Sequence, residues 1–185
     1  MEVEGGTHRE HSVLLRFWMM IAHSHGQVWN ASEIGGSLGF SYMTAKHYLD
    51  VLSQAYVIRQ VQPWHENIAK RQVKMPKVYV RDSGLLHALL GIRNMRALRE
   101  HPKMGLSWEG HIVEEVIAAA GERNTFFWAT HGGAELDLLA MRGGNRYGFE
   151  CKCNVAPDIT RSMRTAQEEL GLKELFVVHP GSRSF

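Results

Sequence analysis

Apolar residues recur at helical spacing in the first part of the chain and predict three helices. The first helix is expected over residues 11–23, where the apolar stripe consists of Val13, Leu14, Phe17, Trp18, Ile21 and Ala22. Asn30 resembles the cap of a second, short helix that ends at Gly39. Ser41 then caps a third helix, whose inward face consists of Ala45, Leu49 and Leu52.

Two extended stretches follow, at residues 56–61 and 77–80, and they can pair as a hairpin. Three helices followed by a two-stranded ribbon are typical of a winged helix-turn-helix domain of α+β type, which we place at residues 8–95. The third helix of such a domain enters the major groove of DNA, whereas other winged helices serve only as protein-interaction or structural modules. The candidate DNA contacts are the outward residues of the third helix and two basic residues of the connection between the strands, namely Tyr42, Lys46, His47, Lys70 and Arg71.

Two interpretations of Trp64 and His65, which precede these basic residues, stay open. The rings can stack on nucleic acid, or Trp64 can fill the seam between two domains. Asp82 next caps a helix at residues 85–90 that Gly91 ends, and a basic connector follows. We therefore place the domain boundary between about residues 92 and 105.

The pattern of the second half predicts a domain at residues 104–185 with the order α-β-β-β-α-β and a mixed central sheet. The overall class is α/β. Glycine pairs separate the strand candidates, and Gly143-Gly144-Asn145 suits a tight hairpin turn. The expected helices cover residues 107–120 and 159–170, with the strands at 125–130, 134–142, 146–154 and 175–178.

Glu109 lies on the apolar stripe of the helix at 107–120, whereas Glu114, Glu115 and Glu122 lie on its polar side, where we expect solvent. Burial of an unpaired carboxylate costs several kcal/mol. Glu109 should therefore have a cation or a hydrogen-bond donor as its partner. The alternative is that Glu109, close to the start of the helix, reaches water.

Asp137, Glu150 and Lys152 are polar residues within otherwise apolar strands. Strict alternation would place Leu136 and Leu138 on one face of the first strand and Asp137 on the other, and would give Glu150 and Lys152 a common face. The tight turn joins the two strands. The three side chains are therefore expected to converge.

These residue types suit metal-dependent hydrolysis of a phosphodiester. The hard cations Mg²⁺ and Mn²⁺ prefer oxygen ligands, which Asp137, Glu150 and the backbone carbonyl of Cys151 can supply. Glu109 can complete this site or hold a second ion. Lys152 can position or deprotonate the attacking water and stabilise negative charge. Arg161 and Arg164, on the helix after the site, either reach phosphates or form an exposed helical face.

The order of a helix with Glu109, a strand with Glu135-Leu136-Asp137-Leu138-Leu139 and a strand with Glu150-Cys151-Lys152 resembles the PD-(D/E)xK core of restriction endonucleases. The resemblance implies a nuclease-like domain at residues 104–185. It also implies that the catalytic residues are Asp137, Glu150, Lys152 and Glu109.

The chain as a whole is similar to the carboxyl-terminal region of bacterial and archaeal AAA-type ATPases, in which a domain of unknown function follows the nucleotide-binding module. The segments that carry the resemblance are residues 63–67, 70–71, 76–85 and 107–152. It implies a winged helix joined to a nuclease-like domain, with DNA and an ATPase module or another protein as partners. The phosphate-loop pattern G-x-x-x-x-G-K-[ST] is absent from the sequence, so we expect no ATP site and a fragment or orphan carboxyl-terminal region.

Composition adds limits to this picture. The net charge of +2 is unevenly distributed, because residues 1–103 carry 13 Lys and Arg against 8 Asp and Glu, whereas residues 104–185 carry 8 against 11. A basic first half suits a polyanionic partner, although a solvated surface explains the same count. We expect a cytoplasmic location without membrane contact, because the sequence shows neither a secretory signal nor a membrane-length apolar run.

Two functions are therefore in competition. The first is a Mg²⁺- or Mn²⁺-dependent nuclease-like domain coupled to a DNA-binding winged helix. The second is a catalytically inactive module of the same fold that binds nucleic acid or a protein. The sequence leaves the oligomeric state open.

Overall fold

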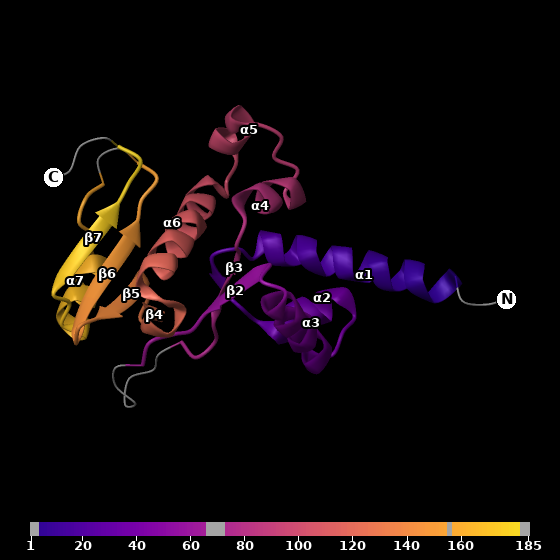
Figure 1. Cartoon of the computed structure of the whole chain (residues 1–185), viewed down its shortest axis with the longest axis horizontal. Coiled ribbons are helices and arrows are strands. Elements are labelled where there is room, and N and C mark those ends of the chain that lie inside the picture. The colour runs from indigo at the N-terminus through magenta and orange to yellow at the C-terminus, as the bar shows by residue number, and fades with distance from the viewer. Residues whose placement is uncertain (1–3, 66–72, 155–156, 182–185) are drawn as a thin grey trace.

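The computed structural model describes residues 4–65, 73–154 and 157–181, and its first unit consists of helices and a small sheet (Figure 1). The helices are α1 (Glu4–His23), α2 (Ala31–Leu38) and α3 (Tyr42–Gln54). The antiparallel sheet has the order β1-β3-β2, with β1 at Gln27–Val28, β2 at Ile58–Val61 and β3 at Lys77–Val80.

The predicted caps fix the ends of the two short helices. The Asn30 side chain accepts hydrogen bonds from the backbone N–H groups of Ser32 at 3.2 Å and Glu33 at 3.3 Å. Gly39 ends α2 with a left-handed φ of 74°, and Ser41 accepts from the N–H of Thr44 at 3.1 Å to begin α3. The inward face of α3 packs on a buried cluster whose largest members are Phe17, Ile21, Leu49 and Leu86.

The predicted ribbon and connector differ from the structure in two elements. Strand β1 was not expected, because two residues are too short for an alternating pattern. The basic connector contains a further helix, α5 (Met95–Glu100), after α4 (Ser83–Leu89). Asn94 caps α5 by accepting from the Ala97 N–H at 2.9 Å. Helix α1 also begins seven residues before the predicted start at 11, at Glu4.

The second unit has the predicted order of elements and a mixed sheet. The sheet order is β4-β5-β6-β7, in which β7 runs parallel to β6 and the other pairs are antiparallel. Figure 1 shows this sheet beside helix α6. The elements are α6 (Met104–Ala120), a one-turn 3₁₀ helix (Glu122–Asn124), β4 (Thr125–Ala129), β5 (Glu135–Arg142), β6 (Asn145–Cys151), α7 (Arg161–Leu170) and β7 (Glu174–Val178).

A β-bulge in β5 corrects the predicted alternation of that strand. Phe126 pairs with Leu139 and Trp128 with Leu136, so β5 has one more residue than β4 between these two pairs. Leu136 and Leu139 consequently both pack in the cluster with α7, whereas Leu138 packs in the cluster with α6. The extra residue therefore changes which side chains of β5 face each helix, next to Asp137.

The two units are joined along β4. Beyond β2, the Trp64 N–H donates to the carbonyl of Phe127 at 2.7 Å, and the Phe127 N–H donates to the carbonyl of Gln62 at 3.0 Å. Trp64 packs edge-on against Phe126 with a centroid distance of 5.0 Å. This contact confirms the interpretation that Trp64 fills the seam between the units. None of the helices in the described ranges has the length and apolar character needed to cross a membrane.

Candidate functional site

Strands β5 and β6 bring Asp137, Glu150 and Lys152 together. The backbone N–H of Cys151 donates to Asp137 Oδ2 at 2.8 Å, which places the Asp137 carboxylate beside the end of β6. Lys152 Nζ donates to Glu150 Oε1 at 2.7 Å. The predicted convergence of these residues is therefore present, although the bulge rather than simple alternation sets the position of Asp137.

Glu109 of α6 joins the same cluster and is only 7% exposed. Tyr79 Oη donates to Glu109 Oε1 at 2.6 Å, and Lys77 Nζ donates to the same oxygen at 3.3 Å. The prediction that Glu109 is buried with a cation or donor is confirmed. The alternative that it reaches water is wrong, because β3 of the first unit covers this part of α6.

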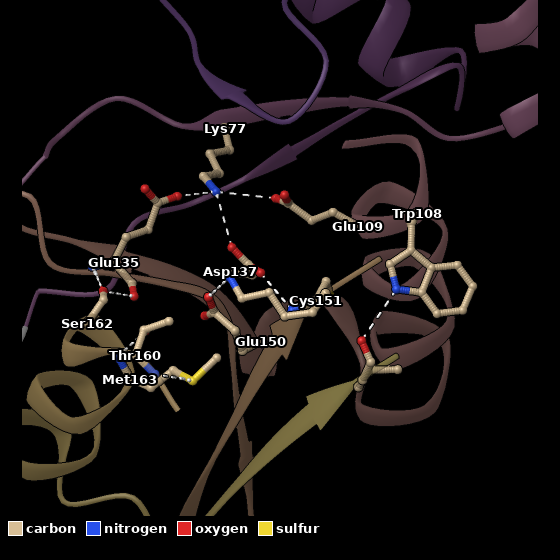
Figure 2. A network of polar contacts seen from close by, with 12 residues as sticks. Lys77, Trp108, Glu109, Glu135, Asp137, Glu150, Cys151, Thr160, Ser162 and Met163 are labelled. Atoms are coloured by element: carbon tan, nitrogen blue, oxygen red, sulfur yellow. Dashed lines mark hydrogen bonds and ion pairs between the residues drawn. The ribbon is translucent and has the colours of Figure 1, made fainter. Parts of the chain in front are cut away.

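Lys77 is the residue that sequence reasoning missed. Its ammonium group forms ion pairs with Glu109, with Glu135 and with Asp137 Oδ1, the last at 4.0 Å (Figure 2). Strand alternation gives Lys77 and Tyr79 the same face of β3, so both reach Glu109. The available signal was a lysine at the start of a short strand whose other residues, Val78, Tyr79 and Val80, are suited to burial.

Neighbouring elements hold the backbone of the site in place. The Glu135 N–H donates to Ser162 Oγ at 2.6 Å, and that hydroxyl donates to the Glu135 carbonyl at 2.6 Å, which ties β5 to α7. Trp108 Nε1 donates to the carbonyl of Val178 at 3.4 Å, which ties α6 to β7. Both contacts appear in Figure 2. The residues of the cluster therefore come from one helix, α6, and three strands, β3, β5 and β6, apart from Lys152, which directly follows β6.

Burial and mutual repulsion raise the pKa values of the three carboxylates. Burial raises the pKa of Glu109 to about 7, although the Lys77 ammonium opposes the shift. Burial also raises the pKa of Asp137, against the opposing effects of Lys77 and the Cys151 N–H. For Glu150, burial and the nearby Asp137 carboxylate raise the pKa, and Lys152 opposes them.

The two lysines respond in the opposite way. Burial lowers the pKa of Lys77, but the carboxylates of Glu109, Glu135 and Asp137 outweigh it and leave the pKa above its ordinary value. The pKa of Lys152 is likewise raised, because the Glu150 carboxylate outweighs burial. Both amino groups are therefore ammonium ions at neutral pH.

The oxygen atoms of the cluster limit how a metal ion can be held. Glu150 is 6% exposed, and its Oε2 has no hydrogen-bond partner among the residues that the structure describes. Within the same residues, no group of three or more His, Cys, Asp or Glu side chains is arranged to hold a metal ion. An ion at Asp137 and Glu150 would therefore need backbone and water oxygens as well, which is how Mg²⁺ is usually bound.

The candidate nucleic-acid contacts lie on different elements. Tyr42, Lys46 and His47 are exposed on α3, and Arg161 and Arg164 are exposed on α7. Along the long axis of the molecule, these two helices lie on opposite sides of β2 and β3 (Figure 1). Lys70 and Arg71 lie outside the described residues.

A second charged cluster joins the units and corrects a prediction. Glu114 accepts from Arg59 Nη2 and from Arg81 Nε, both at 3.0 Å, and its side chain is only 17% exposed. Arg59 also pairs with Glu122 at 3.1 Å. The expectation that Glu114 is solvated was wrong, because the polar side of α6 packs against the first unit. Glu115 and Glu122 are exposed as expected.

Two family models match separate parts of the chain. Residues 104–185 match a family model described as "Domain of unknown function (DUF4143)". Two similar relatives are "Uncharacterized protein Mb2031c" of Mycobacterium bovis and "Uncharacterized protein Rv2008c" of Mycobacterium tuberculosis. Each is 45% identical over 174 residues, which cover 94% of this chain and 40% of the relative.

The chain thus spans about 40% of the length of these curated relatives. No solved structure matches it. Residues 4–96, which make up half of the chain, match the model described as "Domain of unknown function (DUF8612)". The chain belongs to this DUF8612 family.

Proposed function

We propose that the second unit is a metal-dependent nuclease-like domain that hydrolyses phosphodiesters and is coupled to a DNA-binding winged helix. One observation carries the proposal, namely the approach of Asp137 to the Glu150-Cys151-Lys152 segment through the 2.8 Å bond from the Cys151 N–H. Two carboxylates and a lysine at the centre of a sheet are costly to keep without a ligand. They are the groups that phosphodiester hydrolysis with a hard cation requires.

The arrangement of elements supports both parts of the proposal. The order α6-β4-β5-β6-α7-β7, with β7 parallel to β6, is that expected of a restriction-endonuclease-like domain. In the first unit, helices α1 to α3 precede the β2–β3 pair, as in a winged helix. Tyr42, Lys46 and His47 on the exposed side of α3 would then be the DNA contacts.

The residues of the site would have separate tasks. Bound Mg²⁺ or Mn²⁺ would polarise a phosphoryl oxygen and make a coordinated water more acidic. Asp137, Glu150 and the Cys151 carbonyl would supply oxygen ligands. Lys152, whose side chain is 33% exposed and is held by Glu150 at 2.7 Å, would orient the attacking water and stabilise the charge that develops on the phosphate.

A second candidate function is a catalytically inactive module of this fold that binds nucleic acid or a protein, for example the ATPase module suggested by the sequence resemblance. The position of Lys77 favours this alternative, because its ammonium group already neutralises carboxylates of the cluster. A site that balances part of its charge internally needs less metal. Fold and residue types alone do not establish turnover.

A nuclease assay distinguishes the two functions. The protein is incubated with plasmid and with single-stranded DNA in the presence of Mg²⁺ or Mn²⁺, together with Asp137→Asn and Lys152→Met. The matched controls are Asp158→Asn and Lys173→Met, at exposed positions. We expect each site variant to lose roughly 100-fold or more of the cleavage rate, and the controls to lose none. Equal rates for all five proteins would contradict the nuclease function.

A further inference from the structure

Lys77 enters the carboxylate cluster from the other unit of the chain. It begins β3, is 3% exposed, and makes its ion pairs with Glu109 of α6 and with Glu135 and Asp137 of β5. Figure 2 shows its amino group between these side chains. The attraction of three carboxylates offsets the free-energy cost of removing this ammonium group from water. The offset is available only in this position, so Lys77 acts as a fixed internal cation.

Glu109 is committed to residues of β3. Its Oε1 accepts from Lys77 at 3.3 Å and from the fully buried Tyr79 hydroxyl at 2.6 Å. This carboxylate therefore acts as a counter-ion that holds Lys77 in place. The interpretation differs from the sequence-based expectation that Glu109 is itself a metal ligand.

The charges of the cluster balance with one divalent ion. The cluster contains the carboxylates of Glu109, Glu135, Asp137 and Glu150 and the ammonium groups of Lys77 and Lys152. When all these groups are ionised, the four negative charges exceed the two positive charges by two. One divalent cation neutralises this excess, whereas two would reverse its sign. Uncompensated charge of either sign is costly at a buried site.

The available oxygens lie away from Lys77. Glu150 Oε2 is buried and has no hydrogen-bond partner in the described part of the chain, and the Glu150 carboxylate forms an ion pair with Lys152 through Oε1. Asp137 faces both sides, with Oδ1 toward Lys77 at 4.0 Å and Oδ2 accepting from the Cys151 N–H. The cluster thus divides into a part filled by an ammonium group and a part with an unused carboxylate oxygen.

We propose that the Lys77 ammonium permanently fills the position that a second divalent ion would take, so that the site binds a single Mg²⁺ or Mn²⁺ ion between Asp137 and Glu150. The proposal rests on the function proposed above and adds the stoichiometry of its metal. Lys77 and Tyr79 become positioning residues, which act on the site through Glu109 and Asp137. Two-metal sites place their ions about 3.5–4 Å apart, which is the spacing that Lys77 would prevent.

The test counts Mn²⁺ ions bound by the full chain, using calorimetric titration and electron paramagnetic resonance. The wild-type protein should bind one ion per chain, with the spectrum of an isolated Mn²⁺. Lys77→Met, which keeps the length of the side chain and removes the charge, should bind two ions with a broadened, coupled spectrum. Lys77→Arg keeps the charge and should bind one ion. Lys74→Met, with the same charge change at an exposed position, should also bind one.

Each outcome has a separate meaning. Two coupled ions in the wild-type protein would overturn the role of Lys77. This measurement uses no substitution, so its result does not depend on whether a variant folds. A single ion in a folded Lys77→Met protein, checked by circular dichroism, would also overturn it and leave the proposed metal site intact. Absence of Mn²⁺ binding to the wild-type protein at millimolar concentration would instead remove the metal site itself.

Discussion

A β-carbon on Gly110 would come within 2.4 Å of Nε2 of His25, so α6 and the turn after α1 meet where only glycine fits. His25 Nδ1 accepts from the Val80 N–H at 3.0 Å, and Nε2 lies 3.1 Å from the carbonyl of Leu106. Because Nδ1 accepts, the neutral ring carries its proton on Nε2 and donates it to Leu106. The ring is 2% exposed and is held by a hydrogen bond at each nitrogen, so it cannot move away from α6 without breaking one of them.

Gly110→Ala should destabilise the protein. Alanine is the better helix former by about 1 kcal/mol, but the clash with the fixed His25 ring should cost about 1–3 kcal/mol and exceed that gain. Gly105→Ala is the matched control in the same helix, since nothing in the described part of the chain lies within 4 Å of its added β-carbon. Urea unfolding measures both. A Gly110→Ala midpoint equal to that of Gly105→Ala would contradict the packing described.

Stability should fall on acidification because of His25. Burial, opposed in part by the hydrogen bond to Leu106, lowers the pKa of His25 to about 4, whereas an unfolded histidine titrates near 6.5. The unfolded state therefore binds more protons between these values, and the stabilisation present above pH 6.5 is lost as the pH falls toward 4. The full loss is about 3 kcal/mol.

A comparison with His25→Asn isolates this contribution. Glu109, whose pKa is raised to about 7, acts in the opposite direction, because its folded state binds the extra proton as the pH falls. The difference between the wild-type and His25→Asn stability curves should therefore shrink from pH 7 to pH 4. Nuclear magnetic resonance titration of the ring is a direct measurement, and a pKa near 6.5 would refute the expected burial effect.

Tyr79→Phe should cost about 1–3 kcal/mol of folding free energy, because it removes the 2.6 Å hydrogen bond to the buried Glu109 carboxylate. The ring itself keeps its packing. The control is Tyr42→Phe at an exposed position of α3, where we expect a change within about 0.5 kcal/mol. Equal denaturation midpoints for the two variants would show that the Tyr79 hydroxyl does not hold Glu109.

Glu114→Gln should destabilise the contact between the units. The side chain of Arg59 is 6% exposed, so loss of the Glu114 charge leaves a buried guanidinium whose remaining counter-ion among the described residues is the exposed Glu122. We expect a loss of about 2–4 kcal/mol, close to the range for a broken buried ion pair. Glu115→Gln, one residue further on an exposed face, should change stability by less than about 0.5 kcal/mol. Thermal unfolding of both variants supplies the comparison.

Features with a local cause could be predicted from the sequence. The caps at Asn30, Ser41 and Asp82 depend on side chains within three residues of the helix start, and the structure confirms them. The burial of Glu109 followed from its place on an apolar stripe. The order of elements in the second unit likewise followed from strand and helix periodicity interrupted by glycines.

Features that depend on distant contacts could not be predicted. Lys77 and Glu109 are separated by 32 positions and belong to different units, so no periodic pattern connects them. The polar side of α6 was interpreted as solvent-facing because the partner of Glu114 is Arg59, 55 positions away. The bulge in β5 depends on the register with β4, which a single strand does not encode.

The pairing of Lys77 with Glu109 should restrict how these two positions vary among relatives. Residue 77 lies in the region matched at 4–96 and residue 109 in the region matched at 104–185. Each region supplies one half of a charge pair, and each half is buried by the other region, so loss of one charge in a chain with both regions leaves the other charge buried and unbalanced. We therefore expect substitutions at these two positions to occur together across relatives that contain both regions, whereas in a protein with only one of the regions we expect that position to face solvent and to vary independently.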